Sequence, residues 1–137
     1  MRCFAVAVAE GSSLDRYTNN FSLFQLFEQF RPSAYPASLP VYLHAFLEVD
    51  AGDQGVEHEV RILLLHGGNV VFASVVLSFR PEGERHRVRV RGLTFPEPGL
   101  YSVALEWRRK AQGQGSGEEP WTREPVRWPI RADVPLQ

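Results

Sequence analysis

The fold is decided by the stretch Val41-Tyr42-Leu43-His44-Ala45-Phe46-Leu47-Glu48-Val49, near the middle of a 137-residue chain. Every odd-numbered position in it is apolar, whereas its polar residues all stand at even-numbered positions. Because successive side chains of a strand point to opposite faces, this alternation predicts a β-strand with one buried and one wet face. The same period returns in residues 71–79 and 101–107. Repeated half-buried strands predict an all-β protein.

Turn residues divide the chain into eight expected strands. Glycine supplies the positive φ that tight turns require, so His66-Gly67-Gly68-Asn69 predicts a hairpin between two of them. Pro125 and Pro129 confine the last strand to an edge or divide it in two. The expected strands are Cys3–Ala9, Phe21–Phe30, Val41–Val49, Glu57–Leu65, Val70–Phe79, His86–Leu93, Leu100–Arg108 and Trp121–Arg131.

Short strands and frequent turns predict an immunoglobulin-like antiparallel β-sandwich of about seven to eight strands, in one domain over residues 1–137. Tyr101 follows a Pro-Gly corner and enters a strand, as does the corner tyrosine of such sandwiches, whose hydroxyl bonds the upstream backbone. Val103 stands where antibody domains have cysteine, so this likeness concerns architecture alone.

The segment Phe21–Phe30 allows a second interpretation. Its apolar residues at 23, 26, 27 and 30 have the spacing of an amphipathic helix, and Asn20 precedes them as a possible cap. Apolar side chains on both parities also suit a strand that is covered on both faces. We prefer the strand, and the pattern alone leaves the helix open.

Composition limits the partners. The chain is 44% hydrophobic and 12% aromatic, and its net charge is −1. This charge gives no reason to expect nucleic acid or an anionic membrane as a partner. The apolar run near the N-terminus ends at Glu10 and alternates like a strand, so it does not predict a signal peptide. No stretch approaches the ~18 apolar residues of a membrane helix. We therefore expect a cytoplasmic protein.

Residues with catalytic or metal chemistry are sparse. Cys3 is the only cysteine, which excludes an intrachain disulfide and a cysteine-rich metal site. No serine stands in a strand-turn-helix elbow. We expect no enzyme, no cofactor and no metal site. The four histidines lack ligand spacing and are expected on the surface, at His44, His58, His66 and His86.

An arginine ladder is the sharpest local feature. Its members alternate with other residues along one expected strand, so their side chains share one face at a spacing of ~7 Å. Guanidinium groups match oxyanions, which makes the ladder a candidate contact for phosphates or an acidic partner. The alternative is a solvent-facing row that pairs with acids on a neighbouring strand, such as Glu57 and Glu59. The ladder consists of Arg85, Arg87, Arg89 and Arg91.

The polar turn at residues 15–20 also allows two interpretations. Asp, Thr and Asn side chains bond backbone groups and close turns. Alternatively, the turn is a recognition loop at one end of the sandwich, formed by Asp15, Arg16, Tyr17 and Asn19. Trp121 follows a proline and could be an exposed anchor for a partner.

Three stretches in a fixed order carry a resemblance: Asp15-Arg16-Tyr17-Thr18-Asn19-Asn20, Tyr35-Pro36-Ala37-Ser38-Leu39-Pro40 and Phe95-Pro96-Glu97-Pro98-Gly99-Leu100-Tyr101. Together they resemble a widespread family of small bacterial proteins of unknown function, with a D-x-x-T-N turn, an F-P-A-x-x-P loop and a late P-x-P-G-x-Y corner. The resemblance covers nearly the whole chain and implies a stand-alone β-sandwich. It favours a strand over residues 21–30 and implies no catalytic residue, cofactor or substrate.

The sequence thus favours a non-enzymatic binding or assembly module that acts through edge strands or end loops. A protein partner or a second copy is expected, because residues 4–9 carry neither charge nor proline and the aromatic residues of 21–30 cannot all face one core. We expect a homodimer. The alternatives are a small enzyme or ligand-binding protein whose site is assembled across loops, or an anion-binding protein that uses the arginine ladder.

Overall fold

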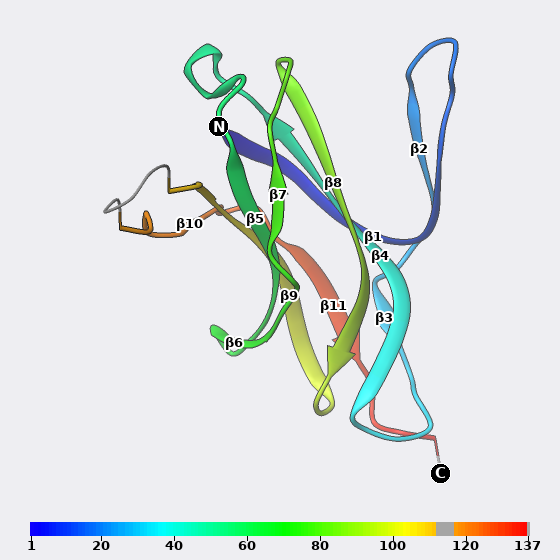
Figure 1. The fold of residues 1–137 in the computed structure, drawn as a ribbon. Helices are drawn as coiled ribbons and strands as arrows, with labels where there is room; N and C mark the ends of the chain where they lie inside the picture. The colour runs from blue at the N-terminus through cyan, green and yellow to red at the C-terminus, as the bar shows by residue number, and fades with distance from the viewer. Residues whose placement is uncertain (112–116, 137) are drawn as a thin grey trace.

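The computed structural model describes residues 1–111 and 117–136. They form an all-β protein in which two sheets pack face to face (Figure 1). Within these residues the only helical element is the 3-10 turn η1 (Ala51–Asp53). No helix in the described part of the chain could cross a membrane. The all-β prediction is therefore confirmed.

The first sheet has four strands in the order β2-β1-β4-β8, with antiparallel neighbours throughout. Its longest strand, β1, pairs with β4 through its first half and with β2 through its second half. The two edges are β2 and β8. The bounds are β1 (Arg2–Leu14), β2 (Phe21–Leu26), β4 (Ala37–Glu48) and β8 (Arg85–Phe95).

The second sheet has seven strands, with β3-β11-β9-β5-β6 in order, β10 beside β9 and β7 beside β5. Its pairs are antiparallel except β3 with β11, which run parallel. The antiparallel prediction is wrong at this one pair. The bounds are β3 (Gln29–Phe30), β5 (His58–His66), β6 (Asn69–Ala73), β7 (Leu77–Phe79), β9 (Gly99–Arg109), β10 (Thr122–Arg123) and β11 (Trp128–Ala132).

The core lies between the sheets and follows the alternation seen in the sequence. The odd-numbered residues of 41–49 are all buried, as are Ile62 and Leu64 of β5 and Leu105 of β9. Burying each of the valine, leucine and isoleucine side chains in this set stabilises the fold by roughly 1.5–3 kcal/mol. The even-numbered residues of β4 point to the outer face of the four-stranded sheet.

The segment 21–30 is extended, so the helical interpretation is wrong, but it forms two strands rather than one. β2 belongs to the four-stranded sheet and β3 to the seven-stranded sheet. Gln25 has a φ of 52°, and the Phe27 N–H donates to the Val8 carbonyl where the chain crosses between sheets. This crossing lets Phe27 and Phe30 pack against the core, while Phe21 stays on the outer face.

Two other expected strands are also divided. Residues 70–79 become β6 and β7, separated at Ser74, whose hydroxyl accepts the Ile62 N–H at 2.9 Å. Residues 121–131 become β10 and β11, which is one of the two outcomes predicted from their prolines.

The corner tyrosine forms the bond that its position predicts. Tyr101 is 3% exposed, and its hydroxyl donates to the Glu97 carbonyl at 2.6 Å. Its ring meets Phe95 edge-on, with 5.1 Å between centroids. The side chain thereby ties the turn before β9 to the core.

Candidate binding face of the four-stranded sheet

The arginine ladder lies on the outer face of β8, at an edge of the four-stranded sheet. All four side chains are exposed. In the register of β8 with β4, Arg87 stands opposite Phe46, Arg89 opposite His44 and Arg91 opposite Tyr42. Three of the four ladder arginines therefore stand opposite an aromatic side chain.

Each ladder arginine lies over an aromatic ring. The distances from guanidinium carbon to ring centroid indicate cation–π contacts, which run from about 0.5 to 1 kcal/mol at exposed sites. They join β8 to three other strands of the same sheet. The contacts are Arg85 over Phe4 at 5.5 Å, Arg87 over Phe21 at 4.6 Å, Arg89 over Tyr42 at 4.9 Å and Arg91 over Tyr42 at 5.8 Å.

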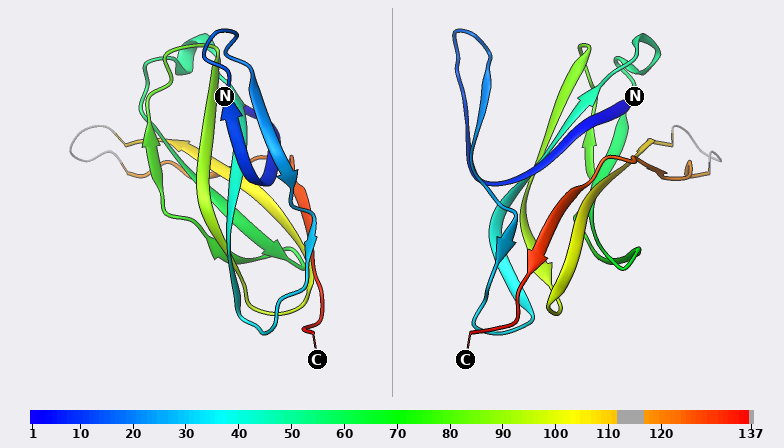
Figure 2. Two further views of the ribbon diagram at one scale, coloured as in Figure 1. Left: turned by 90° about the vertical axis from the view of Figure 1, so that its right-hand side faces the viewer. Right: turned by 180° about the vertical axis from the view of Figure 1, so that it is seen from behind.

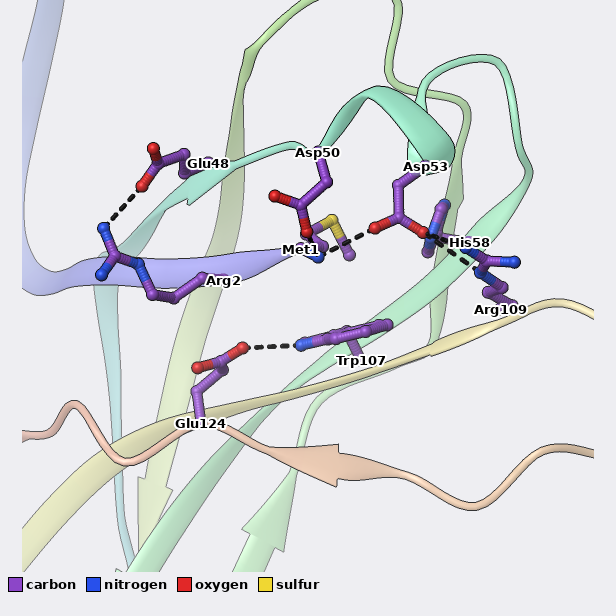
Figure 3. A network of polar contacts seen from close by, with 9 residues as sticks. All are labelled: Met1, Arg2, Glu48, Asp50, Asp53, His58, Trp107, Arg109 and Glu124. Atoms are coloured by element: carbon purple, nitrogen blue, oxygen red, sulfur yellow. Dashed lines mark hydrogen bonds and ion pairs between the residues drawn. The ribbon is translucent and has the colours of Figure 1, made fainter.

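The expected pairing of the ladder with acids is wrong. Glu57 and Glu59 flank or belong to β5 of the other sheet, where Glu59 pairs with Arg108 at 3.1 Å. Glu48, which stands opposite Arg85, binds Arg2 instead (Figure 3). Within the described residues no ladder arginine forms an ion pair. The ladder is thus a row of cations whose nearest partners are rings.

The turn at residues 15–20 joins β1 to β2 and is closed by Asp15. The Asp15 carboxylate accepts the Tyr17 N–H at 2.8 Å, and its carbonyl accepts the Asn19 N–H at 2.8 Å. Hydrogen bonds from the backbone of Tyr17 and Thr18 lower the pKa of this carboxyl. The turn-closing role of Asp15 is confirmed.

The β1–β2 hairpin stands in front of the outer face of this sheet (Figure 2, left). The Phe21 ring lies 5.4 Å from the His44 ring and 5.9 Å from the Phe46 ring, centroid to centroid. A cavity of about 350 Å³ opens between hairpin and sheet. Its wall includes Asn19 and Asn20 from the hairpin, Phe4, Phe21 and Phe46 from the aromatic face, and Arg85 and Arg87 from the ladder.

The two features singled out in the sequence therefore meet at one place, although only in part. Asn19, whose φ is 58°, lines the cavity beside the ladder. Asp15, Arg16 and Tyr17 do not line it, and Tyr17 is fully exposed at the tip. Of the proposed recognition loop, only Asn19 lies beside the arginines.

His44 lies beneath Phe21 on this face, and its expected surface position is wrong. The side chain is 3% exposed, and its Nε2 atom has no hydrogen-bond partner among the described residues. Burial, together with the charge of Arg89, lowers the pKa of the imidazole. The neutral form is favoured, so the positive charge of the face comes from arginine.

A second polar cluster lies at the end of the sandwich near Met1 (Figure 3). The Asp53 carboxylate accepts hydrogen bonds from the Met1 ammonium at 2.8 Å and from Arg109 at 2.7 Å, and its other contact is His58 Nε2 at 3.2 Å. Burial alone would raise the pKa of this carboxyl, but the hydrogen bonds and the charge of the ammonium outweigh it. The pKa falls to about 2.

This cluster is suited to holding the fold together rather than to catalysis. His58 is fully buried against Trp107 and Phe79, and its Nδ1 atom lies 2.7 Å from the Val56 carbonyl. The surface expectation is therefore wrong for His58 too. Because both ring nitrogens are engaged and no solvent reaches the ring, a substrate proton has no access to it.

Two further candidates have structural explanations. Cys3 is buried, and burial raises the pKa of its thiol to about 11, so the thiolate nucleophile is disfavoured. Trp121 is half-buried between the guanidinium groups of Arg61 and Arg108, at 4.3 and 4.2 Å from its ring centroid. Among residues 1–111 and 117–136, no three His, Cys, Asp or Glu side chains are grouped to hold a metal ion.

Comparisons with models of protein families, with curated proteins and with solved structures find no match for this chain. The evidence for a function therefore comes from the geometry of the face on which the arginine ladder, the aromatic rings and the hairpin cavity meet.

Proposed function

We propose that this protein is a non-enzymatic binding module that holds an acidic segment of a protein partner against the arginine ladder. The observation that carries the proposal is the row of exposed arginines that lie over aromatic rings and have no acidic partners in the described chain. A carboxylate-bearing segment supplies the counter-charges that the face lacks.

Contact with the rings prepares these arginines for binding. The guanidinium groups lie 4.6–5.8 Å from the ring centroids, and within the described residues their N–H donors form no ion pair. An arginine side chain carries about 2 kcal/mol of rotamer entropy, part of which is already lost when the side chain is held over a ring. A partner carboxylate therefore meets donors whose positions are restricted in advance.

The lining of the cavity favours binding over catalysis. Its polar side chains are the amides Asn19 and Asn20, the guanidinium groups of Arg85 and Arg87, and the imidazole of His86. Within the described lining there is no carboxylate, hydroxyl or thiol, and the imidazole of His86 is the one group that could act as a base or nucleophile. This composition is typical of a surface that recognises an anion and leaves it unchanged.

The same proposal includes the finer features of the sequence interpretation. The corner bond of Tyr101 and the two packed sheets support an immunoglobulin-like sandwich. The likeness to small bacterial proteins of unknown function and a cytoplasmic site of action are parts of the proposal that rest on the sequence motifs and composition.

The proposal is tested by fluorescence anisotropy with a labelled oligo-glutamate peptide as the probe. We expect binding that weakens as salt rises from about 0.05 to 0.3 M, since exposed charges are increasingly screened over this range. The double variant Arg87→Gln/Arg89→Gln should lower the affinity at least about tenfold, which corresponds to roughly 1.4 kcal/mol.

A matched control separates the ladder from net charge. The variant Arg31→Gln/Arg131→Gln removes the same number of charges away from the ladder and should bind within about twofold of the parent protein. Equal losses in the two variants, or no binding by the parent protein, would overturn the proposal. Tighter binding of an oligothymidylate of equal charge would also overturn it, in favour of a nucleic-acid partner.

A further inference from the structure

β8 has a free edge. The strand pairs with β4 on one side, and its other side has no strand partner among the described residues. Unpaired N–H and C=O groups along such an edge are a template for another extended chain. The arginine ladder belongs to this same strand, so its guanidinium groups lie next to the unpaired backbone N–H and C=O groups of the edge.

A slot with a partly apolar wall runs beside this edge. β7 of the opposite sheet faces β8 across a cavity of about 210 Å³, whose wall combines Val60, Leu77, Phe79 and Val88 with Ser78, His86 and the ladder residues Arg87 and Arg89. Farther along β8, a second cavity of about 370 Å³ is bounded by Phe72 and Leu93, and also by Arg91 and Thr94. Figure 1 shows β7 and β8 descending side by side from the turn that joins them. On its inner side the free edge therefore presents the apolar Val88 next to His86, whose ring stacks on Phe79 at 4.2 Å, and on its outer side it is cationic.

We infer that the acidic partner segment binds as an added β-strand along the free edge of β8, with acidic residues alternating with apolar ones. This inference rests on the proposed function and specifies the partner. Side chains of a strand alternate between faces, so one parity of the added strand meets the ladder and the other enters the slot. The backbone of the segment pairs with that of β8.

Gly92 determines the length of the segment. Its φ is 94°, and it lies where the register between β8 and β4 shifts, so β8 is straight only from Arg85 to Arg91. The six steps between these seven residues, at about 3.4 Å each, span roughly 20 Å. A heptapeptide therefore covers the whole ladder.

A second copy of this chain does not fit the same edge. Pairing of two β8 strands with their outer faces on one side would place one arginine ladder against the other. Like charges directly opposite each other destabilise a strand pair. The ladder therefore opposes self-pairing at β8 and selects an acidic strand.

The test compares two single peptides and one pair, four peptides in all, on the unmodified protein; the Arg87→Gln/Arg89→Gln variant is needed only to separate strand addition from anion binding. The first is the alternating probe Glu-Val-Glu-Leu-Glu-Val-Glu, with both ends capped. The second has the same residues in blocks, with all four glutamates together. The third is a pair of alternating peptides, one N-methylated at the first set of alternate amides and the other at the second set. Alternate amides of a strand point to opposite sides, so only one set faces β8.

We expect the alternating peptide to bind at least about tenfold more tightly than the blocked one. One N-methylated peptide should lose binding and the other should keep it, and amides of Arg85–Arg91 should gain protection from hydrogen exchange. If all peptides bind equally and binding still requires Arg87 and Arg89, strand addition is overturned while the anionic site stands. If neither these peptides nor oligo-glutamate bind, both strand addition and the proposed function are overturned.

Discussion

At the scale of single residues, Asp53 joins three segments that are far apart in the sequence: the N-terminus, β5 and the end of β9. Its pKa of about 2 lies below the ordinary value of 3.8, so the unfolded chain takes up the proton first as the pH falls. The stabilisation, about 2 kcal/mol, is complete above pH 3.8 and is lost as the pH falls toward 2.

Asp53→Asn should therefore lower the free energy of unfolding at neutral pH by about 2 kcal/mol. Urea denaturation as a function of pH should show the difference between variant and parent shrinking below pH 3.8. Asp50→Asn is the control: Asp50 also binds the Met1 ammonium but is 77% exposed, so it should cost far less. A difference that does not change with pH would show that Asp53 acts through packing alone.

Tyr101 is the second residue whose contribution can be isolated. Tyr101→Phe keeps the ring against Phe95 and removes only the hydroxyl, leaving the Glu97 carbonyl without this donor. We expect a loss of roughly 1 kcal/mol in the free energy of unfolding, measured from the denaturation midpoint. Tyr17→Phe, at a fully exposed position, should leave the midpoint unchanged. An unchanged midpoint for Tyr101→Phe would show that its hydroxyl bond does not stabilise the fold.

The sequence predicted which face of a strand the arginine side chains occupy, but not which side chains they contact. Alternation places the four arginines on one face, and they are there. Their aromatic partners Phe4 and Phe21 come from strands whose register depends on tertiary pairing, which no local pattern contains. A signal was nevertheless present at Tyr42 and Phe46, two aromatic residues on the parity expected to be wet. Large rings on that parity indicate that something covers them, here the hairpin and the ladder.

At the scale of secondary-structure elements, the β1–β2 hairpin is the part of the fold that sequence patterns describe least well. Its first strand continues five residues past the expected end at Ala9, because β2 pairs with that extension. Its second strand ends where the chain crosses to the other sheet. The position of that crossing depends on where Phe27 and Phe30 can pack against the core. Neither helical nor strand periodicity in the sequence contains this information.

We predict that Phe21 holds this hairpin on the face. Phe21→Ala removes the ring that covers His44 and Phe46 and supports Arg87, and it should cost about 1–2 kcal/mol in the free energy of unfolding. With burial reduced, the pKa of His44 should rise toward its ordinary value of 6.5, as followed by NMR titration.

Phe24→Ala is the control for this hairpin prediction. Phe24 lies on the same strand, but its side chain is 52% exposed, so its loss should cost less and leave the His44 titration unchanged. If Phe21→Ala also leaves that titration unchanged, the hairpin does not depend on Phe21 for its position on the sheet.

At the scale of the whole molecule, the two edges of the four-stranded sheet differ in charge. β8 carries the arginine ladder, which opposes pairing with a second copy. β2 is the uncharged segment Phe21-Ser22-Leu23-Phe24-Gln25-Leu26. Its side chains Phe24 and Leu26 are each 52% exposed, and we call them the hairpin patch. Exposed apolar patches often mark protein interfaces, whereas charged side chains along a strand edge oppose its pairing with another chain.

We therefore predict a homodimer that forms through the hairpin patch and leaves β8 free for its partner. Sedimentation at about 100 µM should give the mass of two chains, and Phe24→Lys should give the mass of one, since a charge on the patch is buried without a partner on association. Leu100→Lys, at an exposed apolar position on β9, should remain dimeric. A monomeric parent protein at this concentration would contradict the dimer. If Leu100→Lys rather than Phe24→Lys dissociates it, the interface lies on the seven-stranded sheet instead.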